Sequence, residues 1–193
     1  MTTIDFYLTM RPDWSGGIEA TRTWRTSIQQ AVTGSETRSA LFSVVRRGWA
    51  YKIQALGISD LAWLKKVLWR DMHLIVGIPI WTDGVALTDS VDAGLDLILP
   101  VTSLSGREFG EVGTEAILID SENPDHWEAV AMDFPAWNDL YLLDAVTGDW
   151  PAGTMVYPVA ACRIEPAQTI RALTAGVGEF TVNAVEDIGV WTV

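Results

Sequence analysis

The sequence predicts a mainly β fold, a β-sandwich or barrel-like single domain over residues 1–193 with one packed α-helix at about residues 59–72. Short segments in which apolar and polar residues alternate recur along the chain, as they do in half-buried strands. Glycine, proline, aspartate and asparagine separate these segments at short intervals, and only one segment has helical spacing. A chain of 193 residues also buries enough surface for a stable core without metals or disulfides.

Two segments in the first third of the chain show the alternation most clearly. In residues 18–32 six of the even positions are suited to one face of a single strand, with Arg22 an exception: Ile18, Ala20, Trp24, Thr26, Ile28 and Val32. In residues 49–55 the odd positions are apolar, whereas Lys52 and Gln54 lie on the other face. We expect a second strand there, and Gly48 just before it is expected to mark a bulge.

The helical segment follows directly, with the sequence ISDLAWLKKVLWRDM over residues 58–72. Its apolar positions recur at spacings of three and four: Leu61, Leu64, Leu68 and Met72. Ser59 is the expected N-cap, and Asp60 suits the positive end of a helix. The polar face carries three cations: Lys65, Lys66 and Arg70. These features predict a helix that packs across a sheet.

The rest of the chain contains further strand candidates and turns. The expected strands cover residues 4–10, 74–81, 115–120, 127–134, 154–164 and 179–188. WPAGT, residues 150–154, is expected to turn into a strand because it contains Pro151 and Gly153. The run TDSVDAGLD, residues 88–96, places its aspartates three and four apart, unlike the alternate positions of a calcium-binding loop. A solvated loop is therefore favoured over a calcium site.

Charge is distributed unevenly along the sequence. The chain has 13 Lys and Arg against 25 Asp and Glu, a net charge of -12. Residues 1–70 hold ten of the basic residues and five of the acidic ones, about +5, so about -17 remains after position 70. Since the pI is near 4.4 and no nucleic-acid motif is present, sequence-specific nucleic-acid binding is not expected.

Self-association accounts for both charged halves, because a head-to-tail contact joins two different surfaces of the same chain. The alternative is pairing of these charges within one fold. The residues expected at an interface are Trp14, Arg22, Arg25, Glu36, Arg38, Arg46, Arg47, Lys65 and Arg70.

Sequence signatures of enzymes are missing. There is no phosphate-binding glycine loop, no nucleophile elbow and no zinc-protease motif, and paired carboxylates of a glycosidase remain only as a chance arrangement among many acids. Cys162, His73 and His126 do not make a convincing zinc set, and Cys162 is expected to be a small apolar side chain in a strand. We therefore predict no catalytic residues, no cofactor and no metal.

The ten tryptophans are unusual for a chain of this size. Most are expected in the core, but one modest core does not easily hold ten, and exposed aromatic residues are typical of binding surfaces. This favours a tryptophan-rich carbohydrate-binding module as the alternative function. The N-terminus has no signal-peptide pattern, and no apolar run reaches about 20 residues. A soluble, unexported chain without membrane contact is expected, and the lone cysteine suits a reducing cytoplasm.

Three stretches resemble the tail-tip and baseplate proteins of long-tailed bacteriophages. The first, residues 12–53, contains a Trp-Ser-Gly opening, a Gly-x-Glu-x-Arg turn, a basic pair and an aromatic strand: Trp14, Ser15, Gly16, Gly34, Glu36, Arg38, Arg46, Arg47, Trp49, Tyr51 and Ile53. The other two are residues 149–164 and 179–188, so the resemblance covers nearly the whole chain.

This resemblance implies a structural, non-catalytic role in the virion. It implies a homo-oligomeric ring, hexameric or trimeric, that connects the tail tube to the host-facing tip and contacts tube and baseplate hub proteins. The location would be the virion tail, with assembly in the host cytoplasm. Longer members of the family carry a second block of similar pattern, which this chain lacks, so a ring component such as a distal tail adaptor is expected.

Overall fold

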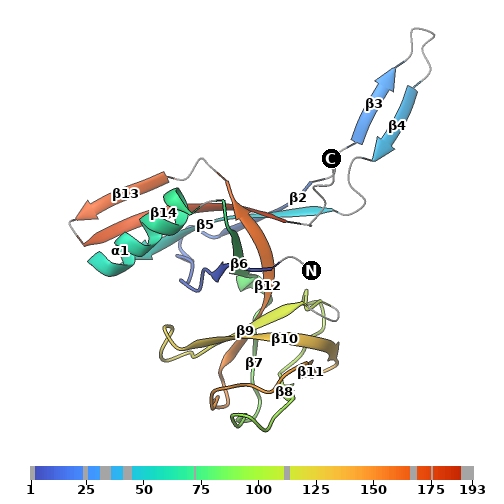
Figure 1. Ribbon diagram of the computed structural model, residues 1–193, viewed down its shortest axis with the longest axis vertical. Coiled ribbons are helices and arrows are strands. Elements are labelled where there is room, and N and C mark those ends of the chain that lie inside the picture. The colour runs from blue at the N-terminus through green and yellow to red at the C-terminus, as the bar shows by residue number, and fades with distance from the viewer. Residues whose placement is uncertain are drawn as a thin grey trace. The chain divides into compact units, whose positions relative to one another are not determined.

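The computed structural model describes residues 3–23, 26–30, 36–40, 45–71, 73–110, 114–165, 169–174 and 176–187, with the backbone alone described for 26–30 and 36–40. The predicted fold class is confirmed: the protein is mainly β with one α-helical segment (Figure 1). The chain divides into two compact units. Thr3–Pro12 and Val76–Ala161 form the first unit, and Asp13–Ile75 and Cys162–Val193 form the second unit. A single domain over residues 1–193 stays a prediction.

The first unit is built from short strands joined by turns. Its elements are β1 (Phe6–Tyr7), β6 (Ile75–Pro79), the 3-10 turn η2 (Trp81–Asp83), β7 (Val85–Ala86), β8 (Ile98–Pro100), β9 (Glu115–Ile119), β10 (Trp127–Ala136), β11 (Asp139–Leu142) and the first part of β12 (Met155–Ile164). Antiparallel pairing runs β7-β12-β9-β10-β11-β8, while β1 pairs with β6 in parallel.

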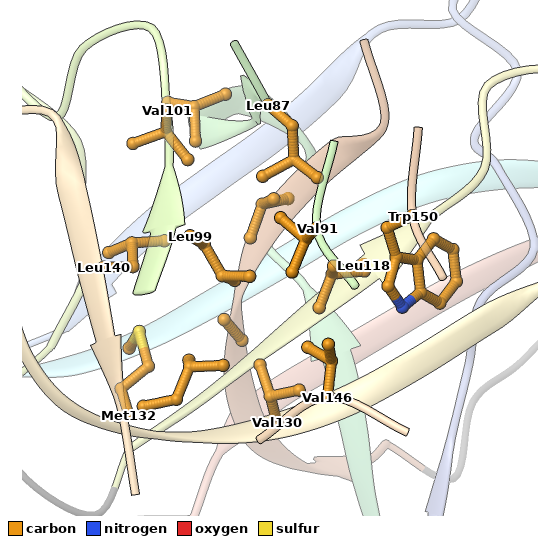
Figure 2. Close-up of a cluster of buried hydrophobic side chains, with 14 residues drawn as sticks. Leu87, Val91, Leu99, Val101, Leu118, Val130, Met132, Leu140, Val146 and Trp150 are labelled. Carbon is orange, nitrogen blue, oxygen red and sulfur yellow. The ribbon is translucent and has the colours of Figure 1, made fainter. Parts of the chain in front are cut away.

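Alternating residues of these strands fill the core of the first unit (Figure 2). Val130 and Met132 of β10 and Leu140 and Leu142 of β11 point into one cluster, because successive side chains of a strand face opposite sides. The indole of Trp150 is buried in the same cluster. The expected turn at residues 150–154 is present, and Gly153 adopts a φ of 88°, which favours glycine.

Glu128 satisfies the polar groups at the edge of this core. Its carboxylate accepts hydrogen bonds from the N–H of Thr147 (2.6 Å), the N–H of Gly148 (3.1 Å) and Nε1–H of Trp150 (2.9 Å). Desolvation raises the pKa of Glu128, but these hydrogen bonds outweigh it and hold the pKa below its ordinary value. A depressed pKa in the folded state means that the carboxylate stabilises the fold at neutral pH and that this contribution is lost as the pH falls.

Replacing Glu128 with glutamine should therefore destabilise the protein by about 1–3 kcal/mol at pH 7, because the amide presents a donor where N–H groups need an acceptor. The difference from wild type should be fully present above the ordinary glutamate pKa of about 4.3. It should shrink as the pH falls further, and it disappears only once the pH passes the lowered pKa of Glu128, where the wild-type carboxylate is itself protonated. Thermal melts across a pH series measure both effects. Glu122→Gln, at an exposed loop position, is the control and should melt like wild type. A pH-independent deficit in Glu128→Gln would contradict the assignment.

The second unit is organised around two long strands. Its strands are β2 (Ile18–Thr23), β3 (Thr26–Gln30), β4 (Glu36–Ala40), β5 (Arg46–Ala55), the end of β12, β13 (Thr169–Thr174) and β14 (Val177–Glu186). β5 pairs antiparallel with β2 on one side and β14 on the other, and β14 also pairs with β13 and β12. The predicted face of β5 is confirmed: Trp49, Tyr51, Ile53 and Ala55 are buried, whereas Lys52 and Gln54 are exposed.

The predicted helix is present as α1 (Ile58–Lys65), which continues as the π-helical turn η1 (Lys66–Arg70). Leu61, Leu64 and Leu68 are buried, as predicted, and Met72 lies outside the described residues. The helix packs on β5 and β14 (Figure 1). Gly178 of β14 permits this approach, because a Cβ there would lie 2.6 Å from Leu61 Cδ1.

Three details of the sequence prediction are wrong. The N-cap is Gly57 and not Ser59, two residues earlier than predicted, and the N–H of Leu61 is bonded to the Gly57 carbonyl at 3.0 Å. Residues 18–32 do not form one strand: β2 pairs with β5 and β3 pairs with β4. Gly48 marks no bulge, since its register is regular. A Cβ there would lie 2.8 Å from Thr21 Oγ1, so the close approach of β2 requires glycine.

The six other predicted strands are confirmed in type. The ranges 4–10, 74–81, 115–120, 127–134, 154–164 and 179–188 overlap β1, β6, β9, β10, β12 and β14, of which β10 ends two residues later and β14 begins two residues earlier than predicted. The expected turn at Gly34–Arg38 is wrong in part. Glu36 and Arg38 lie in β4, which pairs with β3 from Gln30↔Glu36 onward, so the connection precedes Glu36 and falls outside the described residues.

Candidate interaction surfaces

The two units differ strongly in net charge. Residues 3–12 and 76–161 contain 16 acidic and 2 basic residues, a net charge of -14. Residues 13–75 and 162–193 contain 9 acidic and 11 basic residues, a net charge of +2. The charge asymmetry of the sequence is thus an asymmetry between two folded units.

The basic pair Arg46 and Arg47 contacts the C-terminal end of β14. Arg47 Nε donates to Glu186 Oε2 at 2.9 Å, and its guanidinium lies 5.3 Å from the centre of the Trp49 ring. Arg46 Nε donates to the backbone carbonyl of Glu186 at 2.8 Å. Both arginines are therefore engaged within the fold. Their predicted contact with another copy or a neighbouring protein stays a prediction.

Other cations of the second unit have partners in the same chain. Lys52 Nζ lies 3.0 Å from Glu179 Oε1, and Arg163 Nε donates to Asp187 Oδ2 at 2.8 Å. The Asp187 carboxylate is buried, so Arg163 compensates a charge that would otherwise be costly to desolvate.

The remaining predicted interface residues are spread over several elements. Trp14 is exposed in the turn before β2, and Arg22 of β2 lies opposite Arg47 in register. Arg25 lies outside the described residues. Lys65 and Arg70 are exposed on the helix. The structure thus brings Arg22, Arg46 and Arg47 together where β2 and β5 pair.

Glu36 and Arg38 lie on the hairpin of β3 and β4. The two strands pair with each other over five residue pairs, from Thr26↔Ala40 to Gln30↔Glu36, and form a separate two-stranded sheet (Figure 1). A two-stranded hairpin is at best marginally stable by itself in water. This hairpin is therefore a candidate for stabilisation by a partner.

An exposed apolar row crosses three strands of the first unit. Phe134 of β10, Tyr141 of β11 and Ile98 of β8 lie opposite one another in register. Phe134 and Ile98 are 43% and 41% exposed, and the rings of Phe134 and Tyr141 stack at 4.3 Å. We call these three residues the apolar row.

A β-bulge creates this row. Val130 and Met132 point into the core, and a regular strand would send Phe134 to the same side. The register shifts between Met132 and Phe134, which leaves Asp133 as an extra residue. The shift turns Phe134 outward beside Tyr141. Bulges commonly re-aim a side chain at a functional site.

Trp137 stands at the tip of the β10–β11 hairpin. It is 93% exposed and has a φ of 52°, a left-handed conformation that is uncommon for a tryptophan. The tip is held in place by hydrogen bonds from Leu104 N–H to the Trp137 carbonyl (3.1 Å) and from Val101 N–H to the Asn138 carbonyl (2.7 Å). A tryptophan fixed in this exposed position is typical of a binding surface.

The helix presents a second exposed aromatic surface. Leu61, Leu64 and Leu68 face inward, so the opposite side carries Trp63, Lys66, Trp69 and Arg70, all exposed. We call these four residues the outer helix face. Of the eight tryptophans in the described ranges, three are buried (Trp49, Trp81 and Trp150) and five are exposed (Trp14, Trp63, Trp69, Trp127 and Trp137), which explains how one small protein carries so many.

A pocket of about 300 Å³ in the first unit is lined by Tyr7, Glu115, Glu128 and Asp144, among others. Its acidic side chains include two with structural partners: Tyr7 donates to Glu115, and Glu128 holds Trp150 and the preceding turn. Burial raises the pKa of Tyr7, and the hydrogen bond and charge of Glu115 raise it further. Glu115 and Glu128 are therefore occupied in holding the fold together.

The residues considered for metal binding or reactivity lie in hydrogen-bonded or buried positions. In residues 88–96 Val91 is buried, whereas Asp89 and Asp92 are exposed, and Asp96 accepts the N–H of Asp92 at 2.8 Å. Cys162 is buried in β12, as predicted, and burial raises the pKa of its thiol. Across the described ranges, no cluster of three or more His, Cys, Asp or Glu residues could hold a metal ion. Within the same ranges, no helix has the length and apolar character to span a membrane.

Comparison with known proteins gives no family assignment. No protein-family model matches the chain, and a search of curated proteins finds no match either.

Proposed function

We propose that the protein is a structural component of a bacteriophage tail tip or baseplate, where copies form a ring that connects the tail tube to the host-facing tip. Two things support this proposal: the order of the three sequence stretches that resemble such proteins, and a β-rich fold. The single observation that carries it is the β3–β4 hairpin. This hairpin holds Glu36 and Arg38 of the Gly-x-Glu-x-Arg motif and forms a sheet of its own.

A neighbouring copy is the natural partner for such a hairpin. Strands of a two-stranded sheet each have an edge of backbone N–H and C=O groups available for further pairing, and adding strands from another chain satisfies them. Repeating the same contact from copy to copy produces a closed ring when the rotation between copies closes.

The test is to replace residues 26–40 with a short Gly-Ser linker. Wild type should sediment as a closed oligomer and give rings in negative-stain electron microscopy. The variant should sediment as a monomer or small species and melt like wild type, since within the described residues β3 and β4 pair only with each other. A monomeric wild type without rings at concentrations up to about 100 µM, a weak affinity for a structural ring, would reject the proposal.

A carbohydrate-binding module is the second candidate, and the exposed Trp137 favours it. An indole with both faces free can stack on a sugar ring. Saturable binding on a glycan array that disappears in a normally folded Trp137→Ala variant would favour this function over the structural one.

A further inference from the structure

The protein carries two exposed apolar surfaces with opposite charge around them. The apolar row lies on the unit with a net charge of -14, and Asp133 and Asp139 lie beside it on β10 and β11. Asp139 shares the outward face with Tyr141, because the two are separated by one residue in the same strand. Trp137 adds a further aromatic side chain at the hairpin tip.

The outer helix face has the complementary character. Trp63 and Trp69 are exposed between cations, and Lys65, Lys66 and Arg70 outnumber the one carboxylate of this segment after Asp60. That carboxylate is Asp71, which lies 3.9 Å from Lys66 Nζ and 3.1 Å from Arg70 Nε. A single carboxylate shared by two cations leaves the surface positive.

We propose that the outer helix face of one copy docks onto the apolar row of the next copy, with Lys66 and Arg70 facing Asp133 and Asp139. Aromatic side chains form the centre of this contact and charged side chains form its rim, the arrangement typical of protein interfaces. Because the two surfaces differ, the contact is heterologous and propagates from copy to copy. This inference rests on the proposed ring. It assigns a second contact between neighbouring copies, in addition to the contact made by the hairpin.

Charge disfavours negatively charged occupants of the apolar row. Two copies of the acidic unit would repel each other in a contact of the row with itself, and nucleic acid or an anionic glycan would meet the same repulsion. A surface of mixed aromatic and cationic side chains is the suitable partner, and the helix of the same chain supplies one.

The apolar half of the contact is tested with Ile98→Ser combined with Phe134→Ser. Leu173→Ser is the control, since Leu173 is 50% exposed in β13 and the substitution removes exposed apolar surface away from the apolar row. We expect the double variant to need a roughly tenfold higher protein concentration or more to assemble, measured by sedimentation. Its melting temperature should fall only slightly, from the loss of the cross-strand stack of Phe134 on Tyr141. Leu173→Ser should assemble like wild type.

The charged half is tested by reversal and rescue. Lys66→Glu with Arg70→Glu should weaken assembly, and so should Asp133→Lys with Asp139→Lys. The two sets combined should restore assembly, because the attraction returns with opposite sign while the net charge of the chain equals that of wild type. Thermal melts show whether each variant folds. If the chain with all four substitutions does not fold, the rescue is measured in an equimolar mixture of the two double variants, which should co-assemble.

The outcomes separate this inference from the proposed function. Wild-type rings that all these variants leave unchanged would overturn the docking and leave the ring intact. Assembly that weakens but is not rescued by the combined reversal would also overturn it. Saturable glycan binding lost in Ile98→Ser with Phe134→Ser would assign the apolar row to a sugar instead.

Discussion

Leu64→Asp is expected to unfold the second unit, with a loss of about 4 kcal/mol or more, comparable to the whole stability of many small domains. Leu64 is fully buried at the centre of the helix face that packs on β5 and β14. An aspartate there removes apolar contacts and leaves an unpaired carboxylate away from water. Circular dichroism melts and the soluble fraction after expression measure the effect.

The matched control is Lys65→Glu, one residue further along the same helix. Lys65 is exposed, and substitutions at such positions usually change stability by no more than about 0.5 kcal/mol. The control therefore changes the net charge of the protein by -2 without altering the core. Equal melting temperatures for Leu64→Asp and Lys65→Glu would show that the buried face of the helix is assigned wrongly.

Sequence periodicity predicts the features that depend on neighbours along the chain. The leucines of α1 and η1 and the alternating residues of β5 are buried as their spacing indicates, because each pattern spans about two periods or more. Strands β7, β8 and β11 are two to four residues long, too short for a period to be recognised. Their pairing depends on distant partners, so local sequence carries little sign of them.

The apolar row shows why a surface is harder to predict than a core. Val130 and Met132 are buried, so alternation along β10 predicts that Phe134 is buried too. The bulge at Asp133 instead turns Phe134 to the exposed side. Nothing in the local composition marks the bulge. The partner of Arg47 is also hidden from local analysis, because Glu186 lies 139 residues further along the chain.

The charge asymmetry was visible in the sequence, but its structural meaning was not. The sequence divides near residue 70, whereas the acidic unit also contains Thr3–Pro12 and excludes the chain after Ala161. The C-terminal segment belongs to the second unit. Its acidic residues Glu179, Glu186 and Asp187 each pair with a cation there. In-chain pairing thus neutralises much of the second unit and leaves the first unit strongly acidic.

Charge reversal of Arg46 and Arg47 together is expected to affect both folding and assembly. Both side chains contact Glu186, and the Arg47–Glu186 pair is only partly exposed. Reversal replaces these attractions with repulsion among carboxylates, so the free energy of unfolding should fall by about 2 kcal/mol or more. A melting curve alone cannot then tell an internal pair from an interface residue.

A charge swap resolves this ambiguity. Arg47→Glu combined with Glu186→Arg restores the pair within the chain, so the swapped protein should melt close to wild type. If these residues also face a neighbouring copy, as we predict, the swap presents the wrong charges to that neighbour, and assembly should remain weaker than in wild type. Wild-type assembly should also weaken as salt rises past about 0.15 M, where the Debye length falls to about 8 Å. Sedimentation across a salt series measures both effects, and a swapped protein that assembles like wild type would show that these arginines act only inside the fold.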